Sequence, residues 1–502
     1  MNKMIMKTFL LVISLLALSY LLWGCNALQP QALEETEQTD TALDAVTVRI
    51  AVFAGSEQPN LEKVEAAADA LLAPFGIRLE ILFVEYSAWE QSLNLMLTGG
   101  GPTVDLFVIS SKPVSDYVEH GRVMALDDLL DEYGRDIVEI AGMDVLEACR
   151  VGGHIYAVPA QKDHAASYGL MMRKDIVDAL DIHVESIRTL DDLDQVFALV
   201  KKNYPQLCPL VPNSSEAVVQ CWGWDDLGDN HALGVVLNMG QDSTVENLYE
   251  STVYEQFVRT MRRWYEKGYV LADILSSPLP GTALVKQGKA FSYFHNLKPG
   301  VDLEQTRQTG YEMVAVTLVP AYVTTSDISK FSWAVAEGCA HPQQAMIVLN
   351  QLYSDPELAQ LLCNGIENEN YVYTDESHTV IDYPEGIDFS NNTYETSRYV
   401  WPNSFITPVW SPQPPDFYER IRQFNETAVK SRALNFIPYT LSVADQVEAC
   451  GQVVEKYNFM LMSGAVEVDK NLEAFRRELA EAGIEDIIRV KQSQYELWLR
   501  EN

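Results

Sequence analysis

The sequence contains few cysteines and places them far apart. Only 7 of its 502 residues are cysteines, and no CxxC pair or Cys/His cluster occurs among them. Structural zinc sites are built from such closely spaced ligands, so we expect no metal site. Beyond Cys25 the number of cysteines is even, which permits disulfides outside the cell, but spacing alone cannot pair them. We therefore expect buried free thiols.

Basic residues are also scarce. Lys and Arg total 36 against 71 Asp and Glu, which gives a formal net charge of −35. A strongly acidic chain gains nothing from the counterion release that drives nucleic-acid binding, and an anionic lipid surface repels it. The charge therefore excludes nucleic acid as a partner. It also disfavours anionic ligands, unless a local basic pocket opposes the overall field.

The common catalytic motifs are missing as well. The sequence has no GxSxG, HExxH, Walker loop or dinucleotide-binding glycine pattern. A surface glycosidase would use paired carboxylates, but among 71 acidic residues such a pair can always be imagined, so it carries almost no weight. We predict a protein that is not an enzyme and that needs no cofactor.

The N-terminus, by contrast, is informative. Lys3 and Lys7 precede an apolar run over residues 8–23, which is the layout of a secretory signal peptide. The next residues, Leu22-Trp23-Gly24-Cys25, resemble a bacterial lipobox. This predicts lipidation of Cys25 and an anchor on the extracytoplasmic face of the cell membrane. The lipobox argues against the alternative, a retained membrane helix.

A polar, acidic segment without apolar periodicity follows Cys25 and extends to residue 45. This composition is typical of a flexible tether. The rest of the chain, about 460 residues, is too long for one hydrophobic core and indicates two or three packed units.

The first part of this body alternates between strand and helix patterns. Residues 46–53, 77–84 and 104–109 have the pattern of strands, and residues 61–72 and 89–97 have that of amphipathic helices. Strands and helices that alternate over short links are typical of a parallel, doubly wound α/β sheet. The predicted fold class is therefore α/β.

The pattern changes after residue 150. Residues 155–159 and 168–172 resemble strands near a domain crossing, and the chain returns to strand patterns at 311–318 and 331–336. Residues 394–415 are then rich in aromatic residues and proline. Helical patterns complete the chain near 416–432, 444–461, 472–482 and 486–499.

Several segments together carry a family likeness. They are the helix–glycine–strand step at 95–107, the segments 121–129, 153–159 and 173–175, and the shorter stretches 288–291 and 365–372. Their order and spacing resemble those of the extracellular solute-binding proteins of family 1, the sugar-type class. From about Trp401 the chain resembles a helical extension found on a subgroup of these lipoproteins, whose role the family does not define.

The resemblance implies a periplasmic-binding-protein-like fold, in which two doubly wound α/β lobes are joined by a hinge and close on a ligand. We expect the hinge at residues 155–159 and at a return crossing near 318–332. The expected parts are a signal peptide (1–24), a lipidated tether (25–45), lobe 1 (46–154, with a return segment at about 282–330), lobe 2 (155–281, with a return segment at about 331–395) and a helical extension (396–502).

The resemblance also implies a function. Members of this family capture a small ligand and hand it to the permease subunits of an ABC importer, and we expect this chain to do so as a monomer. The aromatic content favours an oligosaccharide or other carbohydrate as the ligand. A sensor lipoprotein that presents its ligand to a membrane receptor would have the same kind of sequence, and peptide or polyol ligands stay open.

Candidate ligand residues follow from the fold. Ligands of open α/β sheets bind beyond the carboxyl ends of the strands, which here selects loops carrying Glu57, Trp89 and Ser110. A sugar site needs flat aromatic surfaces for stacking, and carboxylates or amides for the rim of hydroxyls. Glu57 and Trp89 would supply both kinds of contact. The alternative is that Trp89 begins a helix and packs in the core.

Residues 222–226 are the richest candidate. The indoles of Trp222 and Trp224 are followed by Asp225 and a second aspartate, and these side chains cannot all enter one core if the segment is extended. The alternative is one core tryptophan with aspartates that cap the next helix. Further candidates are Lys162 and Asp163, which follow the crossing strand, together with His295 and Trp333, for which we favour a structural role.

Overall fold

The computed structural model describes residues 45–55, 57–110, 112–213, 222–277 and 279–501. The predicted signal peptide, the lipidation site Cys25 and the tether up to residue 44 lie outside the described residues. Among the residues that are described, no helix combines the length and the apolar character needed to cross a membrane.

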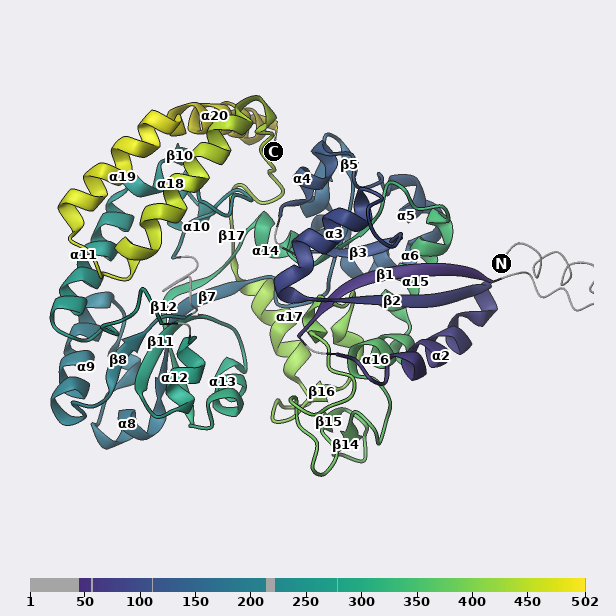
Figure 1. Ribbon diagram of the computed structural model, residues 1–502, viewed down its shortest axis with the longest axis horizontal. Helices are drawn as coiled ribbons and strands as arrows, with labels where there is room; N and C mark the ends of the chain where they lie inside the picture. The colour runs from purple at the N-terminus through teal and green to yellow at the C-terminus, as the bar shows by residue number, and fades with distance from the viewer. Residues whose placement is uncertain (1–44, 56, 111, 214–221, 278, 502) are drawn as a thin grey trace, which may run out of the picture. The chain divides into compact units, whose positions relative to one another are not determined.

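The first lobe is built on a five-stranded sheet in the order β2-β1-β3-β13-β6 (Figure 1). β1 runs parallel to β2 and β3, so the carboxyl ends of these strands meet at one edge, whereas β13 is antiparallel to β3. Every residue of β3 is buried, as expected of a strand covered on both faces. The strands are β1 (Val46–Ala54), β2 (Ile77–Glu85), β3 (Leu106–Ile109), β6 (Val158–Pro159) and β13 (Ser332–Val335).

Helices follow the strands of this lobe and share its hydrophobic core. Both α15 and α16 have proline in their first turn, where its missing N–H costs no hydrogen bond. The helices that follow β1 and β2 confirm the strand–helix alternation predicted for residues 46–109. The helices are α2 (Leu61–Leu72), α3 (Trp89–Leu97), α15 (Pro342–Ser354) and α16 (Pro356–Asn364).

The second lobe has its own five-stranded sheet, in the order β17-β12-β7-β11-β8 (Figure 1). β7 lies between β11 and β12 and is antiparallel to both. A separate hydrophobic core packs α9 (Leu190–Asn203) and α11 (Thr252–Glu266) against the sheet. The strands are β7 (Ala166–Arg173), β8 (Cys208–Val211), β11 (Ala290–Leu297), β12 (Met313–Val323) and β17 (Val429–Lys430).

Each of the two return segments belongs to the other lobe than the one predicted. Residues of the segment 282–330, expected in lobe 1, form β11 and β12 in the lobe 2 sheet, whereas β13 and α15 from 331–395 belong to lobe 1. The periodicity of a buried strand shows that it is buried but not which sheet it joins. That choice is made by long-range pairing, here of β11 and β12 with the two edges of β7.

The C-terminal region, expected as one extension over 396–502, is divided between the lobes. Trp401 lies in the lobe 1 core. The helices α18 (Ala444–Met462), α19 (Val468–Ala482) and α20 (Ile484–Glu501), drawn in yellow in Figure 1, join the core of lobe 2. Phe475 of α19 packs against Tyr249 with ring centroids 4.7 Å apart, so the extension completes the second lobe rather than forming a separate unit.

The chain crosses between the lobes at residues 160–165, 324–331 and 425–432, and hydrogen bonds join these crossings. The side-chain oxygen of Asn425 accepts from the backbone amides of His164 (2.9 Å) and Ala165 (3.0 Å). The ammonium group of Lys162 donates to the carbonyl of Asp327 at 2.9 Å. The hydroxyl of Thr325 accepts from the amide of Asn435 at 2.8 Å. The hinge thus includes a crossing that sequence patterns did not reveal.

The described cysteines agree with the expected free thiols. Cys149, Cys339, Cys363 and Cys450 are buried and Cys208 is partly buried, all with free thiols. Burial raises the pKa of the Cys149 thiol to about 12, so this thiol is protonated and unreactive at neutral pH.

Candidate functional site

Aromatic rings gather where the parallel strands of lobe 1 end. Phe53 lies at the end of β1 and its ring is 5.2 Å from that of Tyr86, which follows β2, and 6.2 Å from that of Phe331, which precedes β13. The ring of Tyr399 lies 5.1 Å from Phe331. Tyr86 is 63% exposed and Tyr399 46% exposed, which is unusual for such large rings. We call Phe53, Tyr86, Phe331 and Tyr399 the aromatic rim.

The backbone of the rim is strained at one residue. Phe331 has a φ of +66°, in the left-handed region that a bulky side chain rarely adopts. Such conformations persist only where the surroundings hold them, and they concentrate at functional sites. The strain therefore supports a functional role for the turn that leads into β13.

A charged cluster lies beside the rim. The ammonium nitrogen of Lys298, which follows β11, is 3.3 Å from the carboxylate of Asp163 and 3.5 Å from that of Glu304. These side chains are only about a quarter to a third exposed. Burial alone would lower the pKa of Lys298, but the two carboxylates raise it. Burial alone would raise the pKa of Asp163, but Lys298 and Lys162 lower it on balance. Lys298 and Asp163 are therefore charged at neutral pH, whereas burial raises the pKa of Glu304.

The rim and the charged cluster are close enough to influence one another. Burial raises the pKa of the Tyr399 hydroxyl, Tyr86 and Asp163 raise it further, and Lys298 opposes them. Exposed rings can stack on the apolar face of a sugar, while carboxylates accept from its hydroxyls and an ammonium group donates to them. We therefore take the rim with Asp163, Lys298 and Glu304 as the candidate ligand site.

The structure brings some predicted residues to this site. Asp163 is part of the charged cluster. Lys162 lies beneath it, 7% exposed, with its ammonium group 5.9 Å from the centre of the Phe331 ring. Glu57 is exposed after β1, and Ser110 is partly buried directly after β3. Glu57 and Ser110 thus lie at the edge of the sheet that the strand-end rule selects, where β1 and β3 end.

Two of the candidate tryptophans are buried in the core, which is the role favoured for Trp333 and the alternative given for Trp89. Trp89 is 1% exposed and packs its ring 5.5 Å from Phe53. Trp333 is completely buried, donates to the carbonyl of Val400 at 2.7 Å, and stacks on Trp401. In this structure neither offers a ring face to a ligand, because each lies on the inner face of its element. Trp89 supports Phe53 of the rim, whereas Trp333 packs within the lobe 1 core.

The segment 222–226 has a mixed role. Trp222 is partly buried between Phe257 and Phe294, with ring centroids 5.6 and 5.3 Å away. Trp224 is 7% exposed and belongs to the lobe 2 core. Asp225 is 1% exposed, and burial followed by the nearby Asp226 raises its pKa to about 7. Of the two tryptophans only Trp222 is partly exposed, and it stays a candidate for ligand contact.

The remaining predicted residue, His295, is partly buried beside Tyr293, with ring centroids 5.9 Å apart. Burial lowers its pKa, so its imidazole is neutral at pH 7. It lies on β11 three residues before Lys298, near the charged cluster in sequence.

Sequence reasoning missed most of the site. Tyr86 lies in the loop that also carries Trp89, directly after the end of β2. That position after a strand end was the usable signal, but Trp89 was predicted as the ligand residue. Lys298 and Glu304 were assigned to the wrong lobe with their return segment. No local signal marks Tyr399 as a partner of Phe331, because only the tertiary fold brings the two together.

A cavity lies on lobe 1 away from the candidate ligand site. A cavity of about 980 Å³ on lobe 1 is lined by α2, α16 and residues of 366–422. Within the described part of the chain, its lining includes neither the rim nor the charged cluster. We place the ligand site at the strand ends, because open α/β sheets bind ligands there.

Two α/β lobes, chain crossings between them, and a ring-and-charge site at the strand ends define a solute-binding protein. The chain belongs to the bacterial extracellular solute-binding protein family, whose model matches residues 55–358. The family predicted from the sequence is thereby confirmed. A second model, a domain of unknown function (DUF3502), matches residues 432–500, which are the helices added to lobe 2.

Relatives agree with this family. The chain is 21% identical over 457 residues to a carbohydrate ABC transporter substrate-binding protein of Streptococcus pneumoniae, covering 89% of this chain and 90% of the relative. An N-glycan transport solute-binding protein from the same species superposes with a TM-score of 0.80 at 19% identity, covering 91% and 99% of the two chains. A binding protein for HMO from Bifidobacterium longum infantis gives 0.65 at 15% identity, with 91% and 99% covered.

Proposed function

We propose that this protein is the substrate-binding subunit of an ABC importer, and that its ligand is an oligosaccharide. The observation that carries the proposal is the pair of exposed rim rings, Tyr86 and Tyr399, beside the Asp163–Lys298–Glu304 cluster. The relative named as a carbohydrate ABC transporter substrate-binding protein supports it. Solved relatives in complex with Man5GlcNAc and with kestose support a ligand of more than one sugar unit.

The ligand we propose is neutral. The chain carries a net charge of −35, and Lys298 is already paired with two carboxylates, so an acidic sugar would find little free positive charge. The protein would bind and release this ligand without chemical change.

The anchor is also part of the proposal. The lipobox-like Leu22-Trp23-Gly24-Cys25 supports lipidation of Cys25 and a location on the outer face of the cell membrane. A Cys25→Ala protein should lose its membrane attachment or stay unprocessed, while its ligand binding is unchanged. Detergent partitioning that does not differ from that of the wild type, together with normal N-terminal processing, would contradict the anchor.

The test of the ligand is a thermal-shift screen of the chain from Thr41 onward against neutral oligosaccharides, acidic oligosaccharides, polyols and peptides. A true ligand at a hundredfold excess over its dissociation constant should stabilise the fold by about 2.7 kcal/mol. Stabilisation by a neutral oligosaccharide that is recovered intact supports the proposal. Stabilisation by peptides alone, or hydrolysis of the sugar, contradicts it. Copurification with permease subunits separates an importer from a receptor-coupled sensor.

A further inference from the structure

Residues 359–431 lie between the two family matches, and the structure shows what most of this segment builds. It completes α16 and then forms a small three-stranded sheet, in the order β14-β15-β16, on lobe 1. Its strands are β14 (Val372–Tyr373), β15 (Val380–Asp382) and β16 (Val409–Trp410), and α17 (Phe417–Thr427) follows. We call residues 365–415 the lobe 1 insertion.

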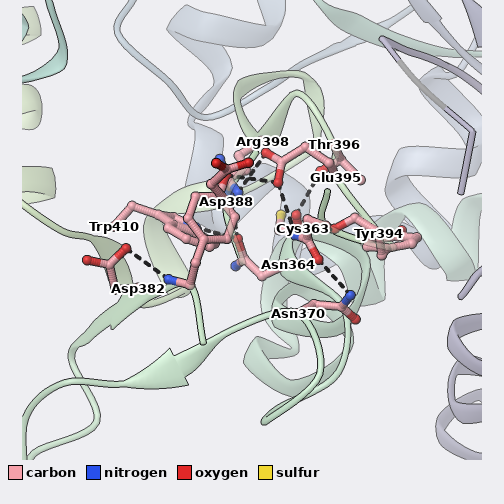
Figure 2. A network of polar contacts seen from close by, with 12 residues as sticks. Cys363, Asn364, Asn370, Asp382, Asp388, Tyr394, Glu395, Thr396, Arg398 and Trp410 are labelled. Carbon is pink, nitrogen blue, oxygen red and sulfur yellow. Dashed lines mark hydrogen bonds and ion pairs between the residues drawn. The ribbon is translucent and has the colours of Figure 1, made fainter. Parts of the chain in front are cut away.

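A network of polar contacts joins the insertion to the end of α16, as Figure 2 shows. The guanidinium group of Arg398 lies 3.8 Å from the centre of the Trp410 ring and donates to Asn364 (2.9 Å) and Glu395 (3.0 Å). The indole of Trp410 donates to the same oxygen of Asn364 at 2.6 Å. The Tyr383 ring packs 4.7 Å from that of Trp410. The surface that carries β15 and β16 is therefore fixed to lobe 1.

The surface that carries β15 and β16 also contacts lobe 2. Arg307, on α13 (Val301–Thr309) of lobe 2, forms an ion pair with Asp382 of β15 at 2.9 Å and also donates to the carbonyl of Ser411. Its guanidinium group lies 5.2 Å from the centre of the Tyr383 ring. The buried Gln413 donates to the carbonyl of Gly300 at 2.7 Å.

The lobe 2 side of these contacts is also the charged side of the candidate ligand site. Gly300 follows Lys298 by two residues, and Glu304 and Arg307 share α13. A shift of the insertion relative to α13 would therefore also move Lys298 and Glu304 relative to the aromatic rim.

We propose that Arg307, Asp382 and Gln413 form a clasp between the lobes, which sets how readily the protein closes on its ligand. The contacts form only when α13 lies against the insertion, so they stabilise the present arrangement of the lobes relative to one in which α13 has moved away. A ligand that binds the closed arrangement gains apparent affinity in proportion to how often the protein is closed. The effect on affinity rests on the proposed function, whereas the effect on closure does not.

The clasp is tested first without any ligand, by small-angle scattering of the chain from Thr41 onward. Arg307→Glu places two carboxylates together, and Asp382→Arg places two guanidinium groups together, so each variant should increase the radius of gyration. The double variant Arg307→Glu/Asp382→Arg restores opposite charges and should restore the wild-type value. Because the pair is about 40% exposed and screened by salt, raising the ionic strength should also open the wild type.

The chain offers a matched control. Arg263 pairs with Asp191 at 3.0 Å and is 43% exposed, against 41% for Arg307. Unlike the Arg307–Asp382 pair, Arg263 and Asp191 both belong to lobe 2. Arg263→Glu should leave the radius of gyration unchanged. A further variant, Gln413→Met, removes the other cross-lobe contact without changing charge and should act in the same direction as Arg307→Glu.

Affinity gives the second measurement, with the neutral oligosaccharide that the thermal-shift screen identifies. Arg307→Glu should weaken binding about fivefold and Gln413→Met about threefold, as expected for an exposed ion pair and one hydrogen bond acting on the closed fraction. Arg263→Glu should not weaken it. Unchanged scattering in Arg307→Glu and Asp382→Arg, with unchanged melting temperatures, would overturn the clasp whatever the ligand is. If no oligosaccharide binds but the scattering changes as described, the proposed function fails and the clasp stands.

Discussion

The two lobes contribute different chemistry to the candidate site. Lobe 1 provides aromatic rings, and Phe53, which anchors them, is itself part of the lobe 1 core. Lobe 2 and its crossing provide Lys298, Glu304 and Asp163, which are held mainly by one another. The ring half of the site is therefore built by the folding of one lobe. The charged half exists only when a crossing and the lobe 2 sheet are correctly placed.

The largest expected effect separates core support from ligand contact on lobe 1. Trp333→Ala removes a completely buried indole that stacks on Trp401, and should lower the free energy of unfolding by about 3–5 kcal/mol. The folded fraction should bind with normal affinity, because the indole has no face toward the site. Urea unfolding and calorimetric titration of the same variant measure both quantities. Full stability with lost affinity would make Trp333 a ligand residue after all.

The rim should show the opposite behaviour. Tyr86→Ala and Tyr399→Ala remove exposed rings, so each should weaken oligosaccharide binding about tenfold to a hundredfold, in the range of aromatic anchors at binding sites. The melting temperature should change little. The control is Tyr439→Ala, which removes a ring that is 50% exposed and lies in the C-terminal region. Equal losses for Tyr439→Ala would show that the rim has no special role.

In the charged half, we expect the loss of one charge to weaken ligand binding, because it leaves the remaining charges without a partner. Lys298→Met leaves the carboxylates of Asp163 and Glu304 facing each other without the cation between them. We expect affinity to fall about tenfold and the pKa of Asp163 to rise, since Lys298 is the main group that lowers it. Titration of affinity between pH 4 and pH 8 checks this, because the variant should bind better at the acid end. An unchanged pH profile would argue against the cluster.

The last expected effect concerns a buried carboxyl on the lobe 2 side of the hinge. Burial, followed by Asp226, raises the pKa of Asp225 from 3.8 to about 7, while the Ser431 hydroxyl and the Leu227 amide oppose the shift. A carboxyl with a raised pKa in the folded state favours folding when protonated, so this contribution is present near pH 4 and is lost as the pH rises toward 7.

Asp225→Asn keeps the neutral form at every pH. It should therefore match the wild type near pH 4 and be more stable by about 1–3 kcal/mol at pH 8. Asp226 and Asp327 also have raised pKa values and lie close by, so the comparison is made between variant and wild type at each pH. A stability difference that does not depend on pH would contradict the raised pKa.

The sequence predicted the features that depend on local patterns and not those that depend on long-range pairing. Residues 46–109 were predicted well, because their strand–helix alternation and parallel pairing are nearly local properties. The assignment of β11, β12 and β13 to sheets was wrong, since any buried apolar strand fits either sheet and long-range pairing decides. The third crossing at 425–432 gave no signal, because it is fixed by side chains such as Asn425 that act across the fold.

The candidate site divides in the same way. The strand-end rule selected the edge at which the aromatic rim lies, and Asp163 was selected because it follows the crossing strand. An aromatic residue in a loop, however, does not reveal from sequence whether it faces solvent or core. Trp89 and Tyr86 are three residues apart, yet one is buried and the other exposed, because Trp89 begins an amphipathic helix whose inner face it occupies.

The central claim is that lobe 1 binds the ring faces of a sugar while the charged cluster binds its hydroxyls. A crystal structure of the protein with the tightest-binding oligosaccharide from the thermal-shift screen tests this most directly. We expect a sugar ring against Tyr86 or Tyr399, with hydroxyls within hydrogen-bond distance of Asp163, Lys298 or Glu304. An oligosaccharide bound in the 980 Å³ cavity of lobe 1, with the rim unoccupied, would contradict it.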